Sequence, residues 1–108
     1  MNTNEYLIKH CVIEDHKGYS LKRLCPRMVC NDGFVMSVQA SSGHYCNPRV
    51  DNAGWYNSVE IGYPSTEEPL IMEYAENEDA PTDTVYGYVP VIVVDAVIEK
   101  HGGLKDES

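Results

Sequence analysis

The stretch Met28-Val29-Cys30-Asn31-Asp32-Gly33-Phe34-Val35-Met36-Ser37-Val38-Gln39-Ala40 carries the clearest local signal in the chain. Two apolar runs flank Asp32-Gly33, a pair typical of a tight turn because both residue types tolerate a positive φ. We therefore predict a β-hairpin with a type I′ turn at this point. Successive side chains of a strand point to opposite faces of the sheet. Those predicted to face the core from the second strand are Phe34, Met36, Val38 and Ala40.

Two more strands are predicted after this hairpin. Residues 57–63 and 84–89 show the alternation of apolar and polar residues that is typical of half-buried strands. In the second of them, Tyr86 and Tyr88 are predicted to share one face and to be displayed with the polar side chains of the neighbouring strands. The strands together predict a sheet of three or four strands, mainly antiparallel, although their order does not follow from the pattern.

Two helices are predicted between and after these strands. A short one covers about residues 69–76, since Pro69 suits a first helical turn. The longer one covers about residues 90–101, where apolar residues recur at helical spacing and Gly102-Gly103 follows as an end signal. The predicted fold class is therefore α+β, with the C-terminal helix packed on one face of the sheet.

The domain prediction is one unit over residues 1–103, followed by a frayed tail over residues 104–108. The first 27 residues are the least readable part. Tyr6-Leu7-Ile8 and Cys11-Val12-Ile13 fit a helix or a strand equally well, and Lys17-Gly18 is predicted to form a turn.

Composition places the chain among globular proteins. Hydrophobic residues make up 43% of its 108 residues, which is ordinary for a folded domain. The sequence has no run of about 18 apolar residues that would span a membrane, and it begins without the basic and apolar regions of a signal peptide. We therefore expect a cytoplasmic protein. In that compartment the four cysteines, Cys11, Cys25, Cys30 and Cys46, are expected to stay reduced.

Charge is distributed unevenly along the chain. The net charge is −9, but residues 1–50 carry six basic and four acidic residues, whereas residues 51–108 carry two basic and thirteen acidic ones. Such an acidic half fits either a solvated surface or a surface that docks on a basic partner. Direct nucleic-acid binding is disfavoured, because it needs concentrated basic residues. The predicted partner-binding residues are Glu67, Glu68, Glu73, Glu76, Glu78, Asp79 and Asp83.

Catalytic and metal-binding patterns in this sequence are either missing or incomplete. The chain has no phosphate-binding loop, dinucleotide-binding glycine set, nucleophile elbow or zinc-protease motif. Cys25, Cys30, His44 and Cys46 do not follow the close spacing of structural zinc ligands. Cys46 as a nucleophile and Glu60 as an acid lack a partner that the sequence would place beside them. We therefore predict a protein that is not an enzyme and needs no cofactor or metal.

A ligand-binding patch is the remaining candidate site. A strand and the long loop after it combine side-chain donors with an aromatic ring and a guanidinium, which forks onto phosphate and stacks on rings. Tyrosines elsewhere in the chain would add stacking surface. The alternative is ordinary loop polarity. The predicted ligand-binding residues are Gln39, Ser41, Tyr45, Arg49, Tyr56, Tyr86 and Tyr88.

Five stretches between residues 28 and 103 carry a recognisable pattern: Met36-Ser37-Val38-Gln39-Ala40-Ser41; His44-Tyr45-Cys46-Asn47-Pro48-Arg49; Tyr56 with Val59-Glu60-Ile61-Gly62-Tyr63-Pro64-Ser65; Val85-Tyr86-Gly87-Tyr88-Val89-Pro90; and His101-Gly102-Gly103. Through them, residues 28–103 resemble a group of small uncharacterised proteins encoded by phages and prophages of gut bacteria. No activity is known for this group, so the resemblance implies a setting and not a mechanism.

In that setting we expect a protein that antagonises a bacterial anti-phage defence system. It would do so either by occluding a defence protein with its acidic half or by sequestering a nucleotide signal in the ligand patch. The alternative is a structural or housekeeping phage protein that acts through protein–protein assembly, including assembly with further copies of itself. No membrane partner is expected.

Overall fold

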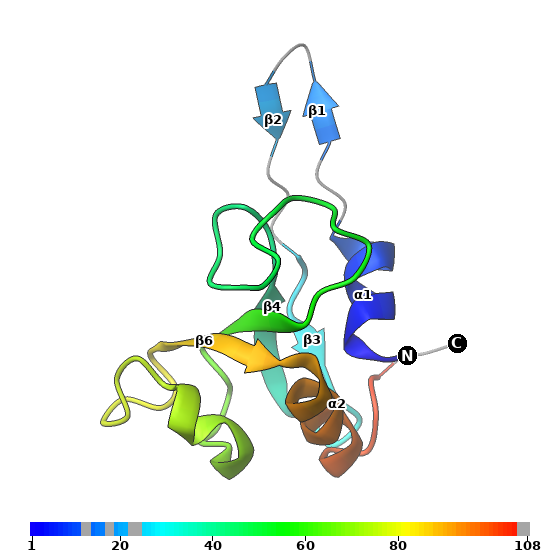
Figure 1. Ribbon diagram of the computed structural model, residues 1–108. Coiled ribbons are helices and arrows are strands. Elements are labelled where there is room, and N and C mark those ends of the chain that lie inside the picture. The colour runs from blue at the N-terminus through cyan, green and yellow to red at the C-terminus, as the bar shows by residue number, and fades with distance from the viewer. Residues whose placement is uncertain (12–13, 17–18, 22–24, 106–108) are drawn as a thin grey trace.

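A computed structural model describes residues 1–11, 14–16, 19–21 and 25–105 of the chain (Figure 1). The helical elements are α1 (Thr3–His10), the short 3₁₀ helix η1 (Pro69–Tyr74) and α2 (Val91–Lys100). The strands are β1 (Glu14–His16), β2 (Tyr19–Leu21), β3 (Met28–Val29), β4 (Val35–Gln39), β5 (Ser58–Gly62) and β6 (Val85–Pro90). The predicted α+β class, with an antiparallel sheet and a C-terminal helix, is confirmed.

The main sheet has four strands in the order β3-β4-β5-β6, and each neighbouring pair is antiparallel. The predicted hairpin joins β3 to β4, but the prediction of a type I′ turn is wrong. Between Cys30 and Phe34 only Gly33 has a positive φ, at 95°. The Gly33 amide donates to the Cys30 carbonyl, and the Cys30 amide donates to the Phe34 carbonyl. A glycine in the left-handed region after a turn is the bulged form of the hairpin.

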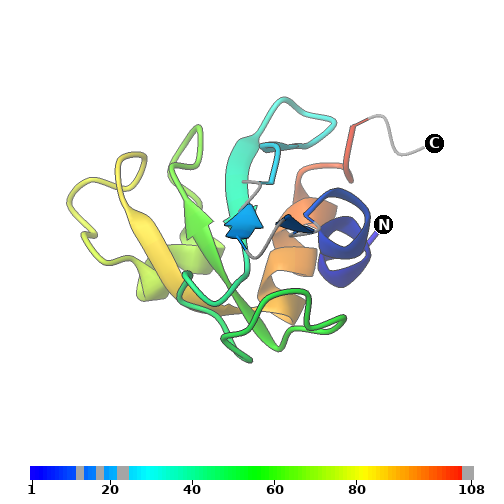
Figure 2. The ribbon, with the colours of Figure 1, turned by 90° about the horizontal axis from the view of Figure 1, so that it is seen from above.

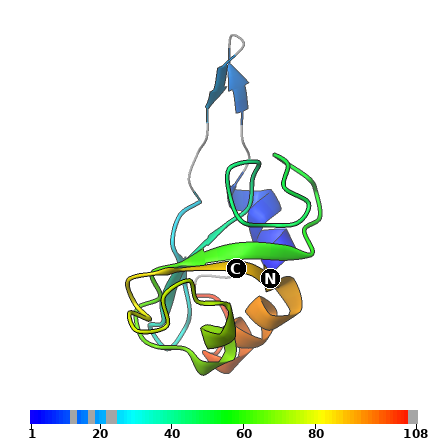
Figure 3. The same ribbon diagram turned by 60° about the vertical axis from the view of Figure 1, so that its left-hand side comes forward.

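The core extends over both faces of the sheet, against α2 on one and against α1 and the long β4–β5 loop, residues 40–57, on the other. Figure 3 shows the sheet edge-on, with α2 and η1 on one side of it and α1 with the β4–β5 loop on the other. The four residues predicted to face the core from β4 and its flanks are all buried. So are the apolar residues that α2 presents to the sheet, Val91, Val94, Val97 and Ile98. The helical spacing predicted this face correctly because α2 is one regular element.

The prediction for β6 is wrong in one respect, because Tyr86 and Tyr88 do not share a face. Tyr86 is fully buried, whereas 51% of Tyr88 is exposed. The register between β5 and β6 shifts near Gly87, and Tyr88 has a φ of +53°. This β-bulge inserts one extra residue and breaks the alternation. Gly87 also lets the loop approach closely, since a Cβ there would lie 3.3 Å from the Cβ of Tyr45.

The first and the last described residues of the chain are held against the body. Helix α1 begins with a capping box made by Asn2 and Glu5, and the Thr3 amide donates to the Asp95 carboxylate of α2 at 2.8 Å. Figure 2 shows α1 next to α2, with η1 towards the other end of the sheet. Near the other end, Leu104 is buried and forms an isolated antiparallel β-bridge with Cys30. The prediction that the tail frays from residue 104 is therefore wrong for its first residue.

The expectation that all four cysteines stay reduced is also wrong. Cys11 and Cys25 form a disulfide with a Cα–Cα distance of 4.9 Å. It closes the segment that contains the antiparallel pair β1 and β2, which stands clear of the main sheet in Figure 1. Cys30 and Cys46 are free and buried, as expected. The predicted turn at residues 17–18 and the apolar pair at residues 12–13 lie outside the described residues.

Candidate partner-binding surface

The predicted ligand-binding patch does not assemble, because two of its polar members serve the fold. Gln39 is 8% exposed, and its amide both accepts from the Cys25 amide at 3.1 Å and donates to the Cys25 carbonyl at 3.2 Å. Ser41 is 2% exposed. Its hydroxyl contacts His44 Nδ1 at 2.6 Å and accepts from the Gly43 amide at 3.1 Å. Both side chains therefore make their hydrogen bonds within the fold.

Two of its tyrosines are buried as well. The Tyr56 hydroxyl donates to the Val50 carbonyl at 2.6 Å, and the ring packs inside the β4–β5 loop. The Tyr86 hydroxyl donates to the Pro81 carbonyl at 2.5 Å. Burial raises the pKa of both phenols. These residues organise loops, and neither ring belongs to the exposed surface where Tyr45 and Arg49 lie.

Three predicted ligand residues do gather at the surface. The Arg49 guanidinium lies over the Tyr45 ring, 5.4 Å from its centroid, and the Tyr45 and Tyr88 rings are 6.0 Å apart. The Arg49 Nε group donates to the Ser42 carbonyl at 3.2 Å, which fixes the side chain over the ring. The cluster is an exposed platform of a cation and two aromatic rings.

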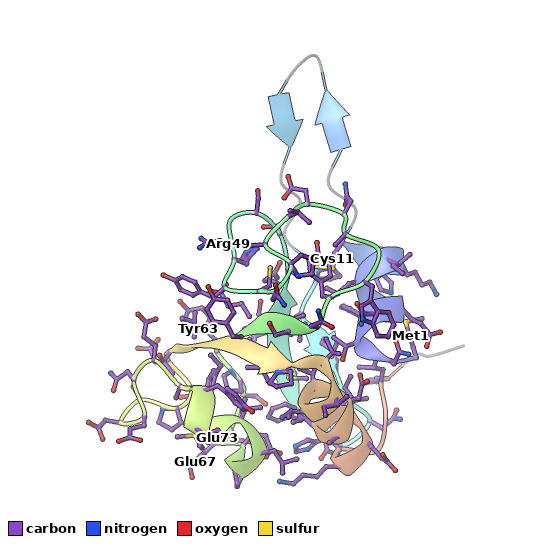
Figure 4. All side chains as sticks on the ribbon, in the orientation of Figure 1. Met1, Cys11, Arg49, Tyr63, Glu67 and Glu73 are labelled. Atoms are coloured by element: carbon purple, nitrogen blue, oxygen red, sulfur yellow. A yellow bond between two sulfur atoms is a disulfide. The ribbon has the colours of Figure 1, made fainter. Side chains whose placement is uncertain are left out.

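The acidic residues assemble much more completely. We call residues 67–83 the acidic segment; it consists of Glu67 and Glu68, the helix η1 that follows them, and the loop that leads to β6. Six of its seven acids are exposed, and none of the six makes an ion pair with a described residue. Figure 4 shows Glu67 and Glu73 at the end of the molecule away from the disulfide. The six are Glu67, Glu73, Glu76, Glu78, Asp79 and Asp83.

Backbone hydrogen bonds hold this segment in a defined shape. The Glu76 amide donates to the Val85 carbonyl at 2.9 Å, and the Asp83 amide donates to the Ala80 carbonyl at 2.9 Å. Ile71 is fully buried and anchors η1 in the core. The Tyr86 hydroxyl ties the loop to β6 through Pro81. The carboxylates therefore stand on an ordered scaffold.

Glu68 is the member that the sequence placed wrongly among the partner-binding residues, because it is 1% exposed. Its carboxylate begins η1 by accepting from the Leu70 amide at 2.8 Å. It also accepts from Lys100 Nζ at 2.9 Å and from His101 Nε2 at 2.8 Å. Glu68 therefore ties η1 to the end of α2 and is not available to a partner.

His101 extends this network to the β3–β4 turn. Its Nδ1 contacts the Asp32 carboxylate at 2.5 Å, and its ring stacks on Phe34 with centroids 4.1 Å apart. Because both ring nitrogens face carboxylates, the geometry favours the doubly protonated imidazolium. Sequence reasoning missed this cluster, since its members come from three distant elements. The only signal in the sequence was that Asp32, Glu68 and His101 each lie near the end of a strand or helix.

The network shifts three pKa values in physically consistent directions. Burial alone would raise the pKa of Glu68, but the hydrogen bonds that it accepts outweigh burial and lower it. The pKa of Asp32 is lowered, first by the Phe34 amide and then by His101. Burial alone would lower the pKa of His101, but its hydrogen bonds to Asp32 and Glu68 raise it.

These shifts predict a stability maximum at mildly acidic pH. The two carboxylates stabilise the fold above the ordinary carboxyl range and lose that contribution as the pH falls through their lowered pKa values. His101 stabilises the fold fully below the ordinary value of 6.5 and loses its contribution as the pH rises through its raised pKa. Urea unfolding at a series of pH values checks this. In His101→Gln the loss at higher pH should disappear, whereas His10→Gln should retain it.

Cys46 and Glu60, the two catalytic alternatives, lie in one neighbourhood. Burial raises the pKa of the Cys46 thiol, which disfavours a reactive thiolate. His44 lies between Ser41 and Glu60, with Nε2 3.9 Å from the carboxylate. This arrangement differs from a Ser-His-acid catalytic triad, because the Ser41 hydroxyl is buried and accepts a hydrogen bond from the Gly43 amide.

Cys25, one member of the zinc pattern, is held in the disulfide. The described residues contain no group of three or more His, Cys, Asp or Glu side chains that could hold a metal ion.

Comparisons with protein families, curated proteins and solved structures gave no match to this chain. Within the described part of the chain, none of the helices has the length and apolar character needed to cross a bilayer. The site must therefore be interpreted from its own geometry.

Proposed function

We propose that this chain is a non-enzymatic binding protein of phage type, which antagonises a bacterial defence system by occupying a basic surface of a defence protein. The observation that supports this best is the ordered acidic segment with its six exposed carboxylates. Clustered like charges cost free energy in the isolated protein, and a basic partner would relieve that cost. An ordered segment loses little conformational freedom on binding, which favours affinity.

The surroundings of the segment support the same proposal. The sequence has no lysine or arginine between residues 51 and 99. Lys100, the next base along the chain, is paired with the buried Glu68. A partner that carries lysines or arginines would therefore meet a surface of one sign, which speeds and orients association.

The phage setting and the bacterial cytoplasm as the place of action rest on the resemblance over residues 28–103. The disulfide between Cys11 and Cys25 is the observation that points the other way, because disulfides are uncommon in reducing compartments. The number of free thiols in protein taken directly from the host cell tests this part of the proposal separately.

A sixfold amide variant tests the binding proposal. It combines Glu67→Gln, Glu73→Gln, Glu76→Gln, Glu78→Gln, Asp79→Asn and Asp83→Asn, and it changes the net charge from −9 to −3 by removing six negative charges. As bait in a bacterial lysate it should bind the basic partner about 100-fold more weakly, at roughly 0.5 kcal/mol for each exposed charge. Wild-type binding should weaken strongly between roughly 0.05 M and 0.5 M salt.

The matched control alters the other exposed cluster. Tyr45→Ala, Arg49→Ala and Tyr88→Gly together remove the aromatic platform; glycine suits position 88, where φ is +53°. This triple variant should bind the basic partner as wild type does. A complex that survives high salt, or that the sixfold amide variant forms equally well, would exclude the acidic segment as the interface.

The second candidate is capture of a nucleotide by this platform. The observation in its favour is the Arg49 guanidinium stacked over Tyr45 beside the exposed Tyr88 ring. A guanidinium and two rings suit a phosphate and a base. It ranks second because the other four predicted ligand residues are buried.

A further inference from the structure

A cavity of about 280 Å³ lies between α1 and the β4–β5 loop. Leu7 and Ile8 of α1 form one wall, Ala40 and Tyr56 form another, and Cys11 of the disulfide closes one end. The cavity opens to solvent beside Ile8, which is exposed. Small-molecule sites are typically concave and mostly apolar, so a cavity with these walls has the character of a ligand site.

The polar groups around the cavity are occupied by the fold. Asn4 uses its amide on the backbone of Tyr56, donating to the carbonyl at 3.0 Å and accepting from the amide at 2.7 Å. The Tyr56 hydroxyl donates to the Val50 carbonyl and accepts from the Ala53 amide at 3.3 Å. The Tyr56 ring thus presents an apolar surface to the cavity.

The chemistry of the walls selects the class of ligand. Among the described residues that line the cavity, none carries a charge, so these walls offer a charged group no ion-pair partner and favour a neutral ligand. An apolar cavity of roughly 150 Å³ is known to bind benzene in another protein. A cavity of about twice that volume fits a molecule of about two fused rings.

We propose that this cavity binds a small neutral aromatic molecule, which lies against the Tyr56 ring. Ile8 lines the cavity with 57% of its surface exposed, which provides an apolar entrance. The site is independent of the acidic segment. Figure 4 shows Cys11 near the β4–β5 loop and Glu67 and Glu73 at the opposite end of the molecule.

Indole is a suitable probe, because it is neutral and has two fused rings. Titration of the isotope-labelled full chain should shift the amide resonances of Leu7, Ala40 and Tyr56 in a saturable manner. Ala40→Leu fills the cavity and should weaken indole binding at least about tenfold. Ile8→Trp fills it from an exposed position, so it keeps the test valid if Ala40→Leu fails to fold.

The matched control is Ile92→Trp, which makes the same change on α2, where Ile92 is 75% exposed. It should bind indole as wild type does, and so should the sixfold amide variant, which separates this proposal from the proposed function. Indole-3-acetate should bind at least about tenfold more weakly than indole, because the described walls offer its carboxylate no ion-pair partner. Absent shifts, equal binding by Ile8→Trp, or equal binding of indole-3-acetate or the aliphatic cyclohexanol would each overturn the proposal.

Discussion

Replacing Glu68 by alanine should lower the free energy of unfolding by about 3 kcal/mol, the lower end of the cost of breaking a buried ion pair. The carboxylate is buried and receives hydrogen bonds from a backbone amide, an ammonium and an imidazolium. Its loss leaves His101 facing an empty space and removes the cap of η1. The cost stays at the lower end because Lys100 is half-exposed and can turn to water. Urea unfolding at pH 6 measures the change.

Glu67→Ala is the matched control, since Glu67 is the adjacent acid in the chain and makes no ion pair with a described residue. Its effect should stay within about 0.5 kcal/mol, as for most surface substitutions. Glu68→Gln should fall between the two, because it retains an acceptor for the Leu70 amide but loses the charge. Equal stability of Glu67→Ala and Glu68→Ala would contradict the network described above.

Removing the disulfide should have a similarly large effect. Its two cysteines are 14 residues apart in the sequence, and closing a loop of about 15 residues is worth about 3 kcal/mol through the entropy of the unfolded chain. The double variant Cys11→Ser, Cys25→Ser should therefore unfold at a clearly lower urea concentration. The expected loss concerns stability, because the main sheet and α2 do not depend on this bond for their hydrogen bonds.

Two controls make this result specific. A reductant should lower the stability of wild type towards that of the double variant and should leave the double variant unchanged. Thiol titration of the unfolded, unreduced protein should find two free thiols, those of Cys30 and Cys46. Four free thiols before reduction would show that Cys11 and Cys25 are not bonded to each other.

The sequence predicts those parts of the fold that depend on neighbouring residues. The hairpin around Asp32-Gly33 and helix α2 were predicted because each is signalled by one short, continuous stretch of sequence. Gly102 and Gly103 both adopt positive φ, at 86° and 88°, as the end of that helix requires. The six exposed acids were predicted for the same reason, since a run of charged residues without apolar partners lies at the surface.

Features that depend on distant residues were not predicted. The bulge at Gly87 separates Tyr86 from Tyr88 because of how β5 pairs with β6. Glu68 is buried because Lys100 and His101 arrive from another element. The disulfide forms because the two ends of the segment that it closes come together. The predicted ligand patch failed on the same ground, since hydrogen bonds to distant backbone groups bury Gln39.

The central claim is that the acidic segment binds a basic host protein. Native mass spectrometry of the tagged protein, recovered at low ionic strength from phage-infected bacteria, tests it most directly. The account predicts a complex with a basic host polypeptide that added salt dissociates and that the sixfold amide variant does not form. Bare protein, or an added mass of nucleotide size alone, would contradict it, and the second result would transfer the function to Tyr45, Arg49 and Tyr88.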